Sequence, residues 1–130
     1  MHDHLVHRYY EELFNQGRVE LITELLAPDY VNHSPGSPQQ DRGRQGVADV
    51  ITALRKGVPD LHCRIEDVVS SPTAVAVRTR VSGTHLGELF GVPPTGRRFE
   101  VTQLAIEHVR DGRIVAHWRV TEDFFAALQR

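Results

Sequence analysis

Apolar side chains recur every three to four residues in three stretches of the first half of the chain. Over residues 4–14 they form a wide stripe, which predicts an amphipathic helix with Asp3 as a candidate cap. A second stripe over residues 19–26 predicts a helix that ends before Pro28, because a proline ring cannot continue a helix. After an extended segment and a loop rich in serine, proline and glycine, residues 47–58 predict a third helix.

The second half of the chain changes from helical to extended spacing. Four stretches rich in β-branched residues, 61–69, 74–81, 98–109 and 113–120, predict long strands. Asp111 and Gly112 are a strong hairpin signal, so the last two strands should pair antiparallel. Residues 122–129 predict a short helix that carries Phe124, Phe125 and Leu128 toward the body. Helices followed by strands indicate an α+β fold.

Both faces of the strand over residues 101–109 are partly apolar. One face should therefore meet the helices and the other a second body, and a homodimer formed through the sheet is the simplest account. A strongly curved sheet in a small domain produces the same pattern without a partner, so both interpretations stay open.

Composition narrows the class of protein. The chain has 130 residues, 40% hydrophobic and 25% charged, with a formal net charge of -2, which fits a single domain over residues 1–130. Charges of both signs are mixed, so we expect no nucleic-acid partner. Cys63 is the single cysteine, which excludes an intramolecular disulfide and a multi-thiolate metal site. Without a long apolar run, we expect a cytoplasmic protein that does not enter a membrane.

Polar residues at inward strand positions are the candidates for chemistry, because burying them without partners costs about 1–3 kcal/mol each. Strand alternation places Trp118 and Val120 opposite His117 and Arg119, so His117 and Trp118 cannot both line a pocket in a regular strand. The candidates are His33, Arg78, His85, Gln103, His117, Trp118, Glu122 and Asp123.

Glu122 and Asp123 are the leading general acid/base candidates, since a carboxylate at an enclosed cavity mouth is held toward its neutral form. The alternative is a helix cap. His33 and His85 end strand-like segments and could donate a hydrogen bond to a substrate carbonyl, or be structural histidines. His4 and His7 lack a third ligand, so we expect no metal site.

Several motifs, in this order and spacing, resemble one known family. They are YVNHSPG near residue 30, GVPDLHCRIEDVV, SGTHLGELFGVPPTGRRFEV, and VRDGRIVAHW followed by acidic residues. Together they resemble the SnoaL-like polyketide cyclases (ester cyclases) of the nuclear transport factor two-like, ketosteroid-isomerase-like superfamily. The similarity runs from about Val6 to the C-terminus.

The resemblance implies a cone-shaped, curved antiparallel sheet wrapped by N-terminal helices, a cystatin-like α+β barrel around a deep hydrophobic cavity. It also implies an intramolecular aldol closure of a polyketide ester without metal or organic cofactor. The family's acid/base aspartate follows a His-Trp pair, which places it at Glu122 with Asp123 next; the family's following Leu-Gly is Phe124-Phe125 here. His33 and His85 match positions near the cavity. The expected substrate-binding residues are Trp118, Gln103, Arg78, Tyr10 and Tyr30.

Three functions are consistent with these residues. The leading one is a cofactor-independent cyclase, isomerase or lyase acting on a hydrophobic carbonyl compound, with Glu122 or Asp123 as base and His85 or His33 as donor. The second is epoxide opening on the same scaffold. The third is a non-catalytic module for binding a small hydrophobic ligand or for dimerisation, because a fold does not determine a function.

Overall fold

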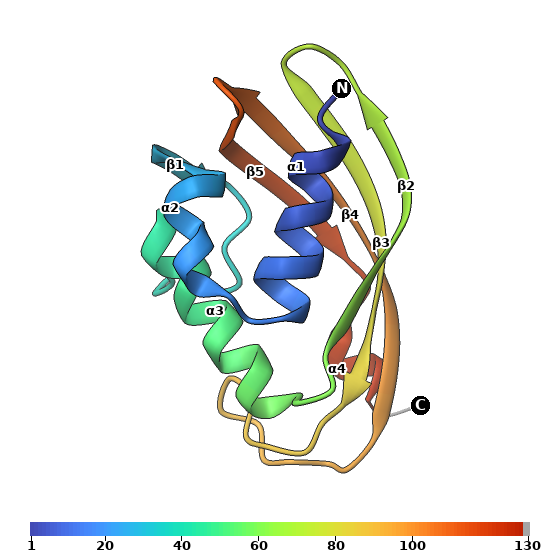
Figure 1. The fold of residues 1–130 in the computed structure, drawn as a ribbon. Helices are drawn as coiled ribbons and strands as arrows, with labels where there is room; N and C mark the ends of the chain where they lie inside the picture. The colour runs from blue at the N-terminus through green and yellow to red at the C-terminus, as the bar shows by residue number, and fades with distance from the viewer. Residues whose placement is uncertain (129–130) are drawn as a thin grey trace.

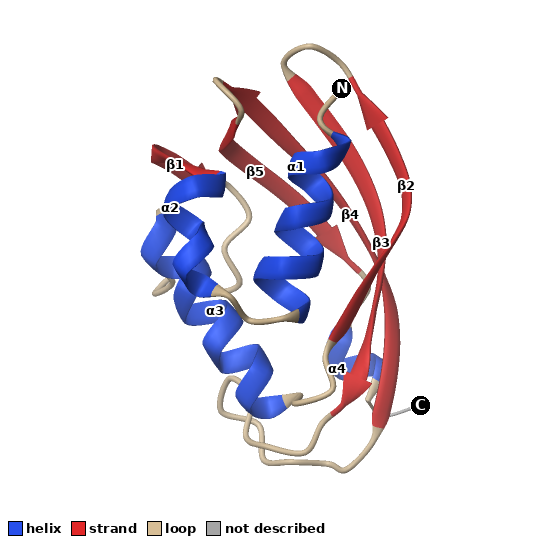
Figure 2. Ribbon diagram, in the orientation of Figure 1, coloured by secondary structure: helices blue, strands red, loops and turns tan. Residues whose placement is uncertain are grey.

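The computed structural model describes residues 1–128, and of Phe125 the backbone only. It is an α+β fold in which helices cover one face of a curved sheet (Figures 1 and 2). The elements are α1 (Asp3–His7), η1 (Arg8–Asn15), η2 (Val19–Leu21), α2 (Ile22–Leu25), β1 (Leu26–Asn32), α3 (Arg44–Gly57), β2 (His62–Ser70), β3 (Ala74–Thr84), β4 (Arg98–Arg110), β5 (Arg113–Thr121) and α4 (Phe124–Ala127). None of the described helices is both long and apolar enough to span a membrane.

The five strands form one sheet in the order β1-β5-β4-β3-β2. The four long strands pair antiparallel, as predicted, and β1 is added in parallel beside β5. The sheet curls around α1 and η1, while α3 closes the side below β1 (Figure 1). The structure therefore confirms the predicted α+β class and the curved sheet wrapped by N-terminal helices.

The second helix ends earlier than its apolar stripe predicts. Strand pairing explains why the helix ends early, because Leu26 already lies opposite Ile114 of β5 and Val31 lies opposite Ala116. The register of β1 against β5 shifts between Leu26 and Val31. Pro28 lies in this irregular part of β1 and is exposed, and it has no N–H to donate to a neighbouring strand. Asp3 is the first residue of α1, and its carboxylate accepts from the N-terminal amine.

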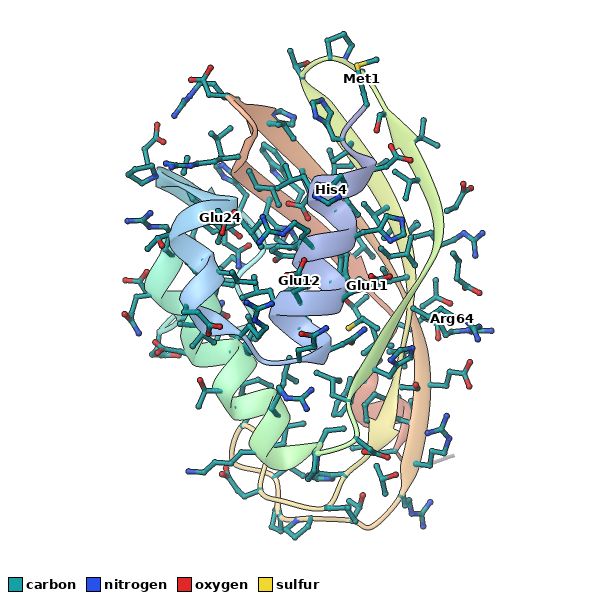
Figure 3. The ribbon with its side chains drawn as sticks, viewed as in Figure 1. Met1, His4, Glu11, Glu12, Glu24 and Arg64 are labelled. Atoms are coloured by element: carbon teal, nitrogen blue, oxygen red, sulfur yellow. The ribbon has the colours of Figure 1, made fainter. Side chains whose placement is uncertain are left out.

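The inward face of the sheet packs against η1. Tyr9, Tyr10 and Leu13 of this helix are buried in one cluster with Val75 and Val77 of β3. Charged side chains lie on the opposite side of the helices, where Figure 3 shows Glu12 and Glu24 pointing outward. Arg8 joins these two carboxylates at 3.0 and 2.7 Å, which ties η1 to α2. The helical layer thus presents its apolar stripe to the sheet and its charges to solvent.

The outward face of the sheet is also apolar near its centre. Leu104, Ile106, Trp118 and Val120 alternate with the buried residues of β4 and β5 and are exposed. Trp118 is 37% and Val120 is 75% exposed. The alternation predicted for β5, with Trp118 and Val120 opposite His117 and Arg119, is confirmed. A dimer through this face stays a prediction.

Candidate functional site

A carboxylate and an imidazole face each other inside the sheet. Glu107 of β4 and His117 of β5 are register partners across the antiparallel pair. Their side chains are 0% and 4% exposed, and Nδ1 of His117 lies 2.6 Å from one Glu107 oxygen and 2.8 Å from the other. A buried carboxylate needs such a partner, because an unpaired charge in the interior is strongly unfavourable. Of the contacts between a carboxylate and a basic side chain among the described residues, this one alone is buried on both sides.

The contacts of His117 determine where its proton lies. A carboxylate only accepts, so Nδ1 carries the proton and donates to Glu107. On the other side of the ring, Nε2 lies 3.3 Å from Nη1 of Arg119, a group that only donates. Nε2 therefore presents its lone pair. A carboxylate that orients an imidazole in this tautomer is the arrangement that makes a histidine a general base.

The segment after β1 holds Arg119 in place. Nη2 of Arg119 donates to the Ser34 carbonyl at 2.7 Å, and its backbone N–H donates to Ser34 Oγ at 2.9 Å. The Ser34 N–H in turn donates to the side chain of Asn32, a buried residue at the end of β1. The parallel pairing of β1 with β5 is thus what brings this segment beside His117.

Three buried tyrosines lie near enough to Glu107 for its charge to affect them. Burial is the main cause that raises the pKa of Tyr10 and Tyr30, and the negative charge of Glu107 raises both further. The pKa of Tyr9 is also raised by burial. These phenols consequently stay protonated and can donate. Within the described part of the chain, the hydroxyls of Tyr10, Tyr30 and Thr79 make no hydrogen bond. The Gln103 side chain lies near the Tyr10 hydroxyl and partly offsets the increase in the pKa of Tyr10.

The residues on the inward side of β4 and β5 become more exposed toward the end of β5. Arg119 and Gln103 are half-buried, and Thr121, which lies opposite Gln103, is exposed. Two open hollows of about 330 and 400 Å³ border α3 and are lined by neither Glu107 nor His117. Arg119 is the half-buried residue that contacts Nε2 of His117 on this side of the ring.

Glu122 and Asp123 do not lie at an enclosed cavity mouth, which corrects the location expected from the sequence. Both are exposed, because β5 ends at Thr121 and the chain turns out of the sheet there. Asp123 Oδ1 accepts from the Ala126 N–H at 3.0 Å, so this carboxylate caps α4. The burial argument that made the two residues candidates does not apply in the structure.

Two residues expected to bind substrate, together with His33, lie on the outward face. His33 stacks on Trp118 with ring centroids 4.5 Å apart, and His108 contacts the same indole at 4.6 Å. Arg78 forms an ion pair with Glu66 at 3.1 Å. Strand alternation sends these side chains away from Tyr10, Tyr30 and Gln103, so the inward location expected for them is wrong.

His85 is buried, but the structure does not bring it to the Glu107 pair. Its Nδ1 accepts from the Thr95 N–H at 3.3 Å and lies 3.1 Å from the Thr95 hydroxyl, which pins the loop between β3 and β4. Glu107 lies opposite Val75, ten residues before His85 along β3, or about 30 Å of extended chain. His85 Nε2 has no hydrogen-bond partner among the described residues. The two groups cannot act on the same atoms.

Sequence reasoning did not include Glu107 among the candidates. Counting back from the hairpin, where Arg110 pairs with Arg113, an unbroken register would place Glu107 opposite Ala116. A shift in register between His108 and Val109 moves it opposite His117 instead. Alternation alone indicates that Glu107 points inward with Ala105 and Val109, and this was the signal available.

Comparison with known proteins gives one consistent result. The family model for SnoaL-like polyketide cyclases matches residues 4–129. Nogalonic acid methyl ester cyclase of Streptomyces nogalater is 30% identical over 90% of this chain and 87% of its own length. The aklanonic acid methyl ester cyclase AcmA of Streptomyces galilaeus is 31% identical over 82% of this chain and 74% of its own. The crystal structure of IdmH from Streptomyces antibioticus, a candidate polyketide cyclase, is 37% identical, covers 99% of this chain and 96% of its own, and superimposes with a TM-score of 0.83.

Proposed function

Because the chain belongs to the SnoaL-like polyketide cyclase family, we propose that it closes a ring in a hydrophobic, polyketide-like carbonyl compound by cofactor-independent acid/base chemistry. The observation that carries the proposal is the buried Glu107–His117 pair, with Nε2 of His117 as proton acceptor. The similarity to methyl ester cyclases supports an ester of this kind as substrate.

In this proposal His117 Nε2 removes a proton next to a substrate carbonyl, and the carboxylate of Glu107 stabilises the imidazolium that forms. The protonated hydroxyls of Tyr10 and Tyr30 are available as donors to substrate oxygens. The apolar residues of η1 and β3 around them favour a hydrophobic ligand. A correctly placed general base raises the rate of such a reaction about 10²–10⁴-fold.

Four variants test whether the Glu107–His117 pair or the Glu122 and Asp123 carboxylates supply the general base. We expect Glu107→Gln and His117→Gln to lower kcat for nogalonic or aklanonic acid methyl ester at least about 100-fold. Glu122→Gln and Asp123→Asn, matched conservative changes on the surface, should stay within threefold of the wild type. Turnover should be followed by chromatography of the cyclised product, with far-UV circular dichroism as the folding control. Loss of turnover in Glu122→Gln or Asp123→Asn alone would return the base to the position that the family resemblance implies.

Two other functions are outcomes of the same assay. If the wild type opens epoxides but leaves the esters unchanged, the Glu107–His117 pair activates water or an internal hydroxyl instead. If the wild type binds these compounds without converting them, the chain is a ligand-binding module. The panel should therefore contain polyketide esters, enones and epoxides, with binding and product measured separately.

We further propose that the chain is a homodimer formed through the outward face of the sheet. Leu104, Ile106, Trp118 and Val120 give this face an exposed apolar centre, which supports a protein contact. The neighbouring charges are already paired, since Arg78 contacts Glu66 and Arg80 contacts Glu100 at 3.1 Å each. Burying this face would leave few unpaired charges.

A further inference from the structure

We propose that Arg119 binds the reacting carbonyl oxygen of the substrate and holds its negative charge while His117 removes the neighbouring proton. The inference rests on the proposed function, because it needs His117 to act as a base. It assigns a catalytic role to a residue that the sequence analysis placed only by its strand face.

Arg119 lies next to the nitrogen that acts as the base. Nη1 of Arg119 lies 3.3 Å from Nε2 of His117. A base and an oxyanion donor must each come within about 3 Å of the group they act on. In an enolisable carbonyl compound the acidic hydrogen and the carbonyl oxygen are on adjacent atoms. A donor and an acceptor 3.3 Å apart can therefore address both at once.

Arg119 is held in one orientation, and its described contacts leave N–H groups that can donate to a substrate. The Ser34 carbonyl fixes Nη2 at 2.7 Å, and Ser34 itself is held by Asn32. A guanidinium carries five N–H groups, and the described contacts of this side chain use only those to His117 and Ser34. Arg119 is half-buried two residues before the end of β5, so it is not fully enclosed in the interior.

The charges on either side of His117 are opposite to those that the reaction creates. In the free site the guanidinium of Arg119 and the carboxylate of Glu107 flank a neutral imidazole. When Nε2 takes the proton, the imidazolium is balanced by Glu107, and the new negative charge on the substrate oxygen is balanced by Arg119. Each charge that appears in the reaction thus meets an opposite charge already in position, which is the arrangement that lowers a barrier most.

The proton and electron balance closes within the substrate. The α-carbon–hydrogen bond breaks, the proton goes to His117 Nε2, and the bonding electrons form an enolate whose oxygen lies at Arg119. The enolate carbon then forms a carbon–carbon bond with a second carbonyl carbon of the same molecule. The resulting alkoxide takes the proton back from Nε2, so no atom or electron is lost and no further reactant is needed.

A purely structural role for Arg119, as a clamp on Ser34, predicts different results. The test uses dibenzoylmethane, a 1,3-diketone that forms a coloured enolate, and its 2,2-dimethyl derivative, which cannot. We expect the wild type to bind dibenzoylmethane with the enolate absorption band and at least tenfold more tightly than the derivative. Arg119→Gln should lose the band and the preference, and Arg119→Lys, which keeps the charge, should recover part of both. Arg113→Gln, an exposed arginine on the same strand, is the matched control.

Turnover gives the second readout. We expect kcat to fall about 100-fold in Arg119→Gln with KM within threefold of the wild type. An enolate band that persists in Arg119→Gln, or is absent from the wild type, overturns the inference, as does a kcat no lower than in Arg113→Gln. If the band depends on Arg119 but no ester is cyclised, the oxygen site stands and the proposed function fails. If turnover depends on Glu107 but not on Arg119, only the present inference fails.

Discussion

The buried Glu107–His117 pair gives a stability test that does not depend on activity. His117→Leu removes the partner and leaves a carboxylate in the interior, so we expect a loss of about 3–5 kcal/mol in the free energy of unfolding. Replacing both residues by leucine removes the charge as well and should cost clearly less than the single change. Urea unfolding of the two variants, followed by circular dichroism, measures the difference. A double variant no more stable than His117→Leu would show that the unpaired carboxylate is not what destabilises the single variant.

Cys63 makes stability depend on pH in the alkaline range. Burial raises the pKa of this thiol to about 12, whereas an exposed thiol in the unfolded chain titrates near about 8.5. The folded state therefore keeps a proton that the unfolded state loses, and stability falls as pH rises from about 9 toward 12, by up to about 1.4 kcal/mol per pH unit. Urea unfolding of wild type and Cys63→Ala between about pH 7 and 9.3, where tyrosines with an unfolded pKa near about 10 contribute little, should show a clearly steeper fall in the wild type than in the variant.

At the scale of elements, the sequence indicates which strands pair but not their exact register. Asp111 and Gly112 adopt the left-handed conformation, with φ of 52° and 75°, that a two-residue hairpin turn requires, so this pairing was predictable. The irregularity between His108 and Val109 was not, because no residue type marks it. Tyr10, Tyr30 and Gln103 were expected in the site and do lie on its inward side. Glu107 was missed although alternation places it inward, whereas its pairing with His117 could not be predicted because it depends on that irregularity.

The contact between β3 and the segment after α3 is tested at Gly83. A Cβ at this position would overlap Cγ1 of Val58, a fully buried residue, so Gly83→Ala should destabilise the protein by about 1–3 kcal/mol. Shortening the opposing side chain in the double variant Gly83→Ala/Val58→Ala should restore part of that loss relative to the sum of the single changes. Thermal unfolding of the four proteins completes the cycle. If Gly83→Ala has the same effect in the wild type and in the Val58→Ala background, this contact is not the cause.

At the scale of the whole molecule, the curvature of the sheet separates two kinds of chemistry. The concave side encloses Glu107, His117 and the buried tyrosines of η1 and β1, whereas the convex side carries Trp118 and its histidine neighbours in contact with solvent. Two adjacent residues of β5, His117 and Trp118, thereby belong to different surfaces. An effect of mutation on turnover and an effect on assembly should therefore be separable along a single strand.

A substitution on the outward face tests assembly without changing the residues of the inward site. Val120→Glu places a charge in the centre of the exposed apolar face, where a dimer contact would have to bury it unpaired, so we expect the variant to be monomeric at concentrations where the wild type is dimeric. Val19→Glu, at an exposed valine on η2 outside this face, is the matched control and should leave the mass unchanged. Sedimentation equilibrium measures both. If the wild type is monomeric, or if Val120→Glu still dimerises, curvature of the sheet remains the reason for its two apolar faces. Turnover by a monomeric Val120→Glu protein would show that one chain holds a complete site.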